Sequence, residues 1–178
     1  MDAPARAFKG DLLLIVDVQE RLAPAIPAAP LVAQRIAALI EKARETGLPI
    51  LASEQYSRGL GGTVPALRHL LADGEMVEKI HFAAPREAAF VAALEARGAR
   101  RCFVAGMEAH VCVLQSALAL LDRGLAVTMI ADAVASRADL DRRLALARLA
   151  RAGATLADSA GVIAAWTAGA EALSPPLD

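Results

Sequence analysis

The sequence contains few residues of the kinds that mark several large classes of protein. Only two of its 178 residues are cysteine and three are histidine. The 19 Lys and Arg residues nearly balance 20 Asp and Glu residues, so the formal charge is −1, and no Lys/Arg-rich run appears. Nucleic acid is bound through a basic surface, which this composition does not supply. We therefore expect small molecules or proteins as partners, and no nucleic acid.

Long apolar runs are also absent. A membrane-spanning helix needs about 18 consecutive apolar residues, and the run DLLLIVDV is far too short. The opening MDAPARAFKGD has no apolar core of the kind found in signal peptides, so we expect a cytoplasmic protein without membrane contact. Hydrophobic residues still make up 56% of the chain. This excess predicts a homo-oligomer, a dimer or larger, with the helix SAGVIAAWTAG as one candidate contact. Trp166, on that helix, is expected to lie in the core or at a subunit contact.

The two cysteines are expected to be free thiols. Cys102 falls within an apolar run that predicts a strand, whereas Cys112 follows the end of that run, so a disulfide between them is not expected. The stretch VAGMEAHVCVLQSALALLDRG (104–124) fits two interpretations of Cys112. It is either a small apolar residue at the start of a buried helix or a nucleophile.

Short β-rich runs alternate with longer helical patterns along the whole chain. Strands are predicted over 12–18, 49–55, 76–82, 101–106, 125–134 and 154–159. Helices are predicted over 29–47, 64–72, 85–98, 110–124, 139–153 and 159–173. This alternation predicts a three-layer α/β/α fold with a doubly wound, six-stranded parallel sheet of the Rossmann-like type. We expect a single domain over 1–178, with a core over about 8–170 and a frayed tail over 171–178.

Three polar residues fall where predicted strands end. Asp17 ends the first strand, Lys79 lies near the end of the third, and Cys112 follows the fourth at the first turn of a helix. Ligands of open parallel sheets bind at this carboxyl edge. Asp17 can act as general base and then general acid for a thiol, and Lys79 can orient both. The alternatives are that Asp17 caps a loop, that Lys79 is solvated and that Cys112 is core.

The start of the helix that carries Cys112 bears on thiol chemistry in two ways. The first N–H groups of a helix have no partner within it and can form an oxyanion hole. A helix N-terminus and a nearby ammonium also lower the pKa of a thiol from its usual ~8.5 toward neutrality. We therefore expect Cys112 to be an acidic thiol that iodoacetamide labels below pH 8, faster than Cys102.

Four segments together resemble the isochorismatase-like cysteine hydrolases, most closely the isochorismatase domain-containing proteins. They are LLLIVDVQERL, SEQYSRGLGGTVPAL, VEKIHFA and VAGMEAHVCVLQSA, and they occur in the family's order. The resemblance implies a catalytic triad of Asp17, Lys79 and Cys112, and a cis peptide bond between Met107 and Glu108. It also implies an oxyanion hole from the backbone N–H groups of Glu108 and Cys112.

The same resemblance implies a cofactor-free hydrolase that cleaves a small amide-like (C–N) or related substrate through a thioester. The main alternative is a catalytically silent family member that acts as a binding or scaffold protein. A nucleotide-binding domain is disfavoured because no GxGxxG turn follows the first strand. Five side chains near the three catalytic candidates are expected to line the substrate pocket: Tyr56, Leu60, His81, Phe82 and His110.

No metal is expected. Nicotinamidases of the same superfamily hold a metal ion with an Asp and histidines from the segment after the second strand. Here that segment offers Glu54 and, several residues further on, His69, but no Asp-x-His pair. A catalytic zinc needs three protein ligands. Nicotinamide is therefore expected to be a poor substrate.

Two further motifs have simpler structural explanations. The stretch ADSAG (157–161) resembles a nucleophile elbow at Ser159, but no histidine follows it in the chain, so Asp158 or Ser159 is expected to cap a helix. The stretch GLGG (59–62) does not join a strand directly to a helix, so it is expected to be a flexible loop near the pocket.

Overall fold

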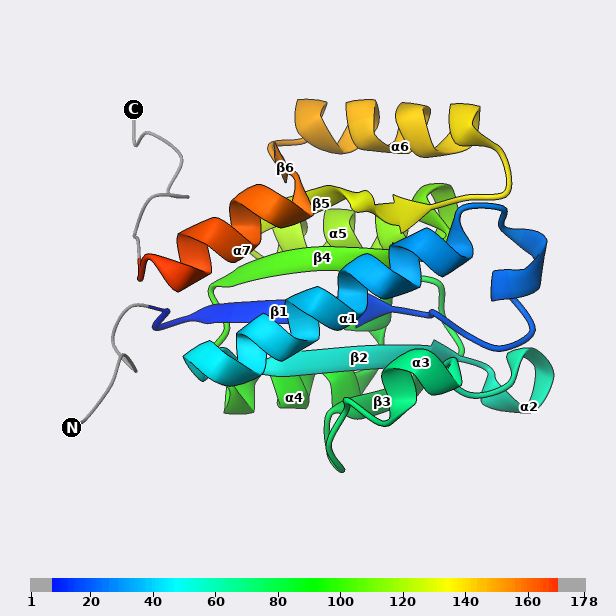
Figure 1. Ribbon diagram of the computed structural model, residues 1–178. Coiled ribbons are helices and arrows are strands. Elements are labelled where there is room, and N and C mark those ends of the chain that lie inside the picture. The colour runs from blue at the N-terminus through cyan, green and yellow to red at the C-terminus, as the bar shows by residue number, and fades with distance from the viewer. Residues whose placement is uncertain (1–7, 170–178) are drawn as a thin grey trace.

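The computed structural model describes residues 8–169, which form one parallel sheet with helices on both faces (Figure 1). The strands are β1 (Asp11–Val16), β2 (Ile50–Gln55), β3 (Met76–Lys79), β4 (Arg101–Met107), β5 (Ala126–Ala135) and β6 (Thr155–Ala157). Each pairs with its neighbours in parallel, in the order β3-β2-β1-β4-β5-β6. The predicted doubly wound, six-stranded parallel sheet is confirmed.

The helices divide between the two faces of the sheet. One face is covered by α1 (Ala29–Thr46), α3 (Pro65–Arg68) and α7 (Ser159–Thr167). The other is covered by α4 (Ala88–Ala96), α5 (Leu114–Asp122) and α6 (Asp139–Arg151). Figure 1 shows α1 and α7 in front of the strands and α4 and α5 behind them. Among residues 8–169, no helix is both long enough and apolar enough to cross a membrane.

The central strand explains why both faces need cover. All six residues of β1 are buried, with Leu13 and Ile15 packing toward α1 and Leu12 and Leu14 packing toward the opposite helices. Side chains of a strand alternate between faces, so a strand that is apolar throughout fits only a sheet covered on both sides. Helix α1 supplies part of that cover through a buried apolar stripe and ends at Gly47, whose φ is 72°.

Several element boundaries differ from those predicted. The strand predicted over 76–82 ends at Lys79, and the helix predicted over 110–124 begins with a π-helical turn, η3 (Ala109–Val113), before α5. The loop predicted over 59–62 begins within one helical turn, α2 (Ser57–Leu60), and 3-10 turns occur as η1 (Ala23–Ala25) and η2 (Ala84–Arg86). The predicted tail over 171–178 lies outside the described residues.

Trp166 belongs to the core and is not a surface contact. Its side chain is 2% exposed, and its ring meets that of Phe103 edge-on, with centroids 5.2 Å apart. Helix α7 therefore turns its one large aromatic side chain toward the sheet. Of the two positions expected for Trp166, the core and a subunit contact, the structure shows the core.

The topological switch point of the sheet, where the strand order reverses, lies between β1 and β4. The chain adds β2 and β3 on one side of β1, then crosses to β4 on the other side. Ligands of such sheets bind outside the carboxyl ends of the strands at this point. The two strands approach closely there, because a Cβ on Gly106 would lie 2.1 Å from the carbonyl oxygen of Val16. The residues that follow β1 and β4 are therefore neighbours.

Candidate active site

A fully buried ion pair lies at the carboxyl edge of the sheet. Lys79 Nζ, at the end of β3, is 2.7 Å from Asp17 Oδ2, directly after β1, and both side chains are 0% exposed. Asp17 leaves the strand with φ of 52°, which directs its side chain to this edge. Its Oδ1 accepts a hydrogen bond of 2.7 Å from Ser53 Oγ. Within the described chain, Oδ2 accepts no hydrogen bond of good geometry, so a lone pair stays open.

The Cys112 thiol adjoins this pair. Cys112 is 6% exposed and lies in η3, the turn that follows β4. Its sulfur is close enough to Asp17 and Lys79 for both to shift its pKa. The structure therefore brings together the three residues predicted to form a triad.

The prediction that Cys112 is an acidic thiol is wrong. Burial, reinforced by the Asp17 carboxylate, raises the pKa of Cys112 to about 12, and the opposing effect of Lys79 is smaller. Burial also raises the pKa of Asp17, against the lowering effects of Lys79 and Ser53. The resting site consequently holds a protonated thiol beside the Asp17–Lys79 pair. Sequence reasoning counted the ammonium and the helix N-terminus but not the burial.

The turn that carries Cys112 does not pair its backbone N–H groups in the regular α-helical way. The N–H groups of Val111 and Val113 both donate to the carbonyl oxygen of Glu108, at 3.1 and 3.2 Å. The N–H of Cys112 lies between them and does not share that acceptor, because a π-helical turn skips the usual bond to the fourth residue back. The peptide bond between Met107 and Glu108 is cis.

The side chain of Glu108 is directed away from this donor. Its Oε2 accepts a hydrogen bond of 3.1 Å from the backbone N–H of Arg137, and its Oε1 lies 3.2 Å from the guanidinium of the same residue. His110 reaches the same segment, with Nδ1 3.0 Å from Ser136 Oγ. The segment before α6 thus holds the turn that carries Cys112, and the His110 ring is engaged there.

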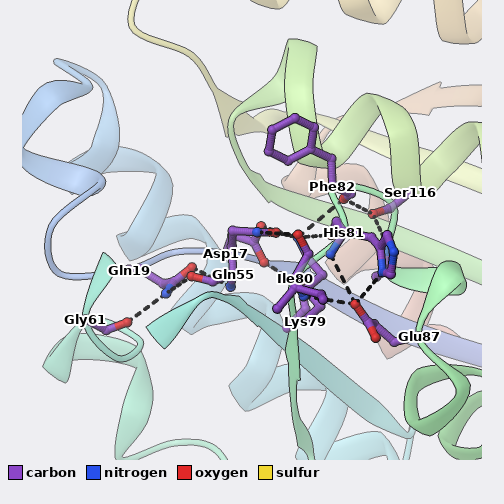
Figure 2. A network of polar contacts seen from close by, with 12 residues as sticks. Asp17, Gln19, Gln55, Gly61, Lys79, Ile80, His81, Phe82, Glu87 and Ser116 are labelled. Atoms are coloured by element: carbon purple, nitrogen blue, oxygen red, sulfur yellow. Dashed lines mark hydrogen bonds and ion pairs between the residues drawn. The ribbon is translucent and has the colours of Figure 1, made fainter. Parts of the chain in front are cut away.

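Lys79 has further partners besides Asp17. Its ammonium donates to Gln55 Oε1 at 2.7 Å and to the carbonyl oxygens of His81 and Phe82 at 3.2 and 3.3 Å. Figure 2 shows these groups converging on the lysine from the end of β2 and from the loop after β3. His81 and Phe82 were predicted as pocket side chains, but the contacts they make here come from their backbone.

The loop after β3 is held from two sides. Glu87 Oε1 accepts from the N–H groups of Ile80 and His81 and lies 2.8 Å from the His81 ring, and these bonds lower the pKa of Glu87 to about 2. Ser116 Oγ, on α5, accepts from the N–H of Ala84 at 3.0 Å. The His81 ring therefore points to Glu87, as Figure 2 shows, and the Phe82 ring is left 57% exposed.

Of the two other predicted pocket residues, Tyr56 contacts Lys79 through its backbone. Tyr56 donates its N–H to the carbonyl oxygen of Lys79, and its ring, 53% exposed, lies over Gly59. Leu60 ends α2 and is partly buried. Leu60 also belongs to the stretch GLGG (59–62), which was expected to form a flexible loop near the pocket.

The remaining candidates have structural partners. Ser159 bonds through its N–H and its hydroxyl to Asp132, and Asp158 caps α7 by accepting from the N–H of Gly161. Glu54 accepts from the N–H and hydroxyl of Thr63, and His69 Nδ1 lies 2.9 Å from the Pro65 oxygen. No three His, Cys, Asp or Glu side chains within 8–169 are grouped to hold a metal ion.

Sequence reasoning missed Ser53, Gln55 and Gln19. All three are polar residues at or just beyond the ends of apolar strands, and that position was the available signal. The register of the sheet sets the pairing, because Ser53 aligns with Val16, the residue before Asp17, and Gln55 aligns with Lys79. Register depends on tertiary packing, so the pattern of a single strand does not give it.

The Isochorismatase domain model matches residues 11–161, which include Asp17, Lys79 and Cys112. The chain belongs to the isochorismatase family. It is 38% identical to isochorismatase domain-containing protein 1 of Salmo salar over 83% of this chain and 52% of that protein. It is also 38% identical to isochorismatase domain-containing protein 2A of Mus musculus over 90% of this chain and 80% of that protein. The chain thus spans about half the length of the first relative.

Solved structures agree with this assignment. The MAR1 ribonuclease of Caenorhabditis elegans superposes with a TM-score of 0.85 at 34% identity, over 92% of this chain and 84% of that one. YcaC of Pseudomonas aeruginosa, solved with covalent acrylamide, has a TM-score of 0.81 at 27% identity, over 87% and 79%. YcaC of Escherichia coli, described as an octameric hydrolase of unknown specificity, has a TM-score of 0.80 at 27% identity, over 87% and 78%. Family and neighbours support a hydrolase.

Proposed function

We propose that this chain is a cysteine hydrolase that cleaves a small amide-like or related carbonyl substrate through a thioester on Cys112. The observation that carries the proposal is the fully buried Asp17–Lys79 pair beside the thiol. Removing two charges from water costs several kcal/mol per ion before their attraction is counted. A cysteine that only fills the core needs no such pair, whereas a thiol that must lose and regain a proton needs a base and a counter-charge.

The first half of the reaction forms the thioester. Asp17 Oδ2 takes the proton of the Cys112 thiol while the sulfur attacks the carbonyl carbon of the substrate. The raised pKa of Asp17 makes it a stronger base than an ordinary carboxylate. The carbonyl oxygen becomes an oxyanion. The C–N bond then breaks, and Asp17 returns its proton to the leaving nitrogen.

The second half regenerates the thiol. Asp17 takes a proton from water, the oxygen attacks the thioester carbon, and the C–S bond breaks to release a carboxylic acid. The sulfur leaves as a thiolate and takes the proton from Asp17. Lys79 keeps its charge throughout, orients Asp17 and stabilises the thiolate whenever it forms.

Backbone donors stabilise the oxyanion in this proposal. The N–H of Cys112, which does not bond to Glu108, and the N–H of Glu108 both belong to the turn after β4. Two such N–H donors stabilise the oxyanion most strongly when the protein holds them in place before the reaction begins. The contacts of Glu108 and His110 with the segment before α6 supply that rigidity.

The substrate class is proposed from the family resemblance and from the donor groups nearby. YcaC of Pseudomonas aeruginosa was solved with covalent acrylamide, which nucleophiles attack at its C=C bond, so this relative supports a reactive nucleophile in the fold and not a particular amide substrate. Near the site of this chain, Glu54 and His69 are committed to Thr63 and Pro65, so we propose cleavage without a metal or cofactor. A small neutral or anionic amide is the favoured substrate, and nicotinamide a poor one.

We also propose that the chain forms homo-oligomers. An open groove of about 950 Å³ beside α1 is lined mostly by apolar side chains, among them Leu31, which is 49% exposed. The octameric YcaC of Escherichia coli supports self-association in this family. Burial of Leu31 and its neighbours against another copy would remove apolar surface from water.

The test is a panel of small amides and esters assayed with the wild-type protein, Cys112→Ala and Cys102→Ala. Cys102 is a matched control because it is a buried thiol on β4 with its pKa raised to about 12 by burial. We expect Cys112→Ala to lose at least about a thousandfold in kcat and Cys102→Ala to keep it. Mass spectrometry of the wild type should trap an acyl group on Cys112.

Two results would contradict the proposal. Full activity of Cys112→Ala on any hydrolysed substrate would exclude a thioester on that residue. If no amide or ester is cleaved and no acyl group is trapped, the chain acts as a catalytically silent binding protein. RNA is included as a further test substrate because one structurally similar protein is named a ribonuclease. We expect no cleavage of RNA.

A further inference from the structure

Gln55 lies beside Lys79 and makes hydrogen bonds in two directions. The two residues align as neighbours across β2 and β3, so their side chains emerge on the same face of the sheet. Gln55 Oε1 accepts from Lys79 Nζ at 2.7 Å, and Gln55 Nε2 donates to the carbonyl oxygen of Ile80 at 2.9 Å. One amide therefore joins the lysine to the loop that follows it.

The orientation of this amide is determined by its neighbours. An ammonium is a donor only and a carbonyl oxygen is an acceptor only, so a flipped Gln55 amide would oppose donor to donor and acceptor to acceptor. Its backbone is held as well. Gln19, 0% exposed, accepts from the Gln55 N–H at 2.8 Å and donates to the Gln55 carbonyl oxygen at 3.0 Å (Figure 2).

The same lysine has three neutral acceptors and one charged partner. Gln55 Oε1 and the carbonyl oxygens of His81 and Phe82 accept its protons, and Asp17 faces it as an ion pair. A neutral acceptor holds the ammonium without reducing its net charge. The remaining charge is then free to act on Asp17 and on the sulfur.

We infer that Gln55 is a positioning residue of the proposed hydrolase: its side-chain oxygen holds the Lys79 ammonium against Asp17 and the Cys112 sulfur. The inference rests on the proposed function. Gln55 does not contact the reacting atoms and acts only through Lys79. A carboxylate in its place would keep an acceptor there, but its negative charge would offset the ammonium.

The experiment measures alkylation of each cysteine by iodoacetamide against pH, so it needs no substrate. The variants are Gln55→Leu, which removes the acceptor, and Gln55→Glu, which keeps an acceptor and adds charge. Glu41→Leu, at an exposed position on α1 outside the groove proposed for self-association, is the control. The titratable or charged groups around Lys79 are Asp17 and Cys112, and beyond the loop backbone His81 with Glu87.

We expect both Gln55 variants to slow labelling of Cys112 about tenfold at pH 8, the change that one unit of thiol pKa produces. The midpoint of labelling should move to higher pH, and Glu41→Leu should behave as the wild type. Labelling of Cys102 in the same samples should not change. A purely structural role would instead loosen the fold and speed the labelling of both cysteines.

Lys79→Met separates failure of this inference from failure of the proposed function. If Lys79→Met slows Cys112 labelling and the Gln55 variants do not, the inference is overturned and the triad stands. If Lys79→Met also leaves labelling unchanged, the triad itself is wrong. Faster labelling of both cysteines in the Gln55 variants would also overturn the inference. For a hydrolysed substrate, Gln55→Leu should lower kcat and leave KM unchanged.

Discussion

At the scale of single residues, the site combines a weakly acidic thiol with a carboxylate that cannot easily be hydrated. Cys112 keeps its proton because burial and Asp17 both oppose ionisation, and Lys79 only partly offsets them. In the proposed reaction the proton therefore moves from sulfur to Asp17 when substrate arrives, and not before. This differs from a thiol that is already ionised at rest, and it changes which labelling result identifies the triad.

Replacing Asp17 by Asn should separate catalysis from thiol acidity. We expect Asp17→Asn to lower kcat about 10²–10⁴-fold, because the general base is gone. Cys112 should nevertheless be alkylated faster at pH 8, since the carboxylate that raised its pKa is gone and Lys79 remains. Labelling rates from pH 6 to 10 test this. Asp73→Asn, on an exposed loop, is the control, and slower labelling of Asp17→Asn would contradict the proposed arrangement.

Chelation gives a second prediction at this scale. Glu54, near the end of β2, and His69, beyond it in the chain, are engaged with Thr63 and Pro65. We therefore expect hydrolysis of the best substrate to survive dialysis against EDTA and elemental analysis to find no stoichiometric zinc or iron. One metal per chain, lost together with nicotinamidase activity on chelation, would show that this interpretation of the segment is wrong.

At the scale of elements, the carboxyl edge depends on how closely β1 and β4 approach. Gly106 has φ of 130°, and a side chain there would meet the backbone of Val16. We expect Gly106→Ala to destabilise the fold by more than about 3 kcal/mol, because neither backbone can move away. Gly124→Ala is the matched control, since Gly124 also has a positive φ but no atom near its Cβ position.

Urea unfolding should show that difference directly. Gly124→Ala should lower the free energy of unfolding by only about 1–2 kcal/mol, which is the cost of a left-handed backbone for a residue with a Cβ. If the two variants lose equal stability, the close approach of the strands does not matter energetically. The Gly106 variant should also label Cys102 faster, because β4 carries that thiol in its buried run.

The loop after β3 should respond to acid through Glu87. Its pKa of about 2 lies below the ordinary 4.5, so its carboxylate stabilises the folded state above about pH 4.5, and this contribution is lost as the pH falls toward 2. Glu87→Gln should therefore melt a few degrees lower than the wild type at pH 6, and the difference should vanish near pH 2. Glu95→Gln, on the exposed side of α4, is the control. A difference that is independent of pH would contradict this account.

At the scale of the whole molecule, exposed apolar side chains lie in more than one place. Leu31 lies beside the groove on α1, Leu140 and Leu144 project from α6, and Ile80 and Phe82 flank the site; all are between 49% and 70% exposed. Such surface is costly in water when it is contiguous. The proposed oligomer accounts for it better than a monomer does.

Light scattering tests the assembly. We expect a particle of at least twice the 18.5 kDa of one chain at micromolar concentration. Leu31→Lys should shift the population toward smaller particles if the groove on α1 is the contact, while Leu144→Lys tests α6 in the same way. A monomer at all concentrations would rule out the proposed self-association.

The order of strands and helices, and therefore the fold class, follows from the sequence alone. Runs such as LLLIV are apolar at every position and fit only a sheet covered on both faces, and such runs alternate with helical patterns. Asp17, Lys79 and Cys112 were predictable as candidates because each is a polar or reactive residue at the end of one of these runs. The local pattern of residues is enough to predict strands, helices and the residues at their ends, because these features depend mainly on neighbours in the chain.

The protonation of the site and the partners of its residues were decided only by the tertiary structure. Ser53 reaches Asp17, and Gln55 reaches Lys79, through strand register and not through adjacency in sequence. The pKa of Cys112 rises because the folded chain removes water from the thiol and places a carboxylate beside it. Burial and register are properties of packing between distant segments, so no single stretch of the sequence contains them.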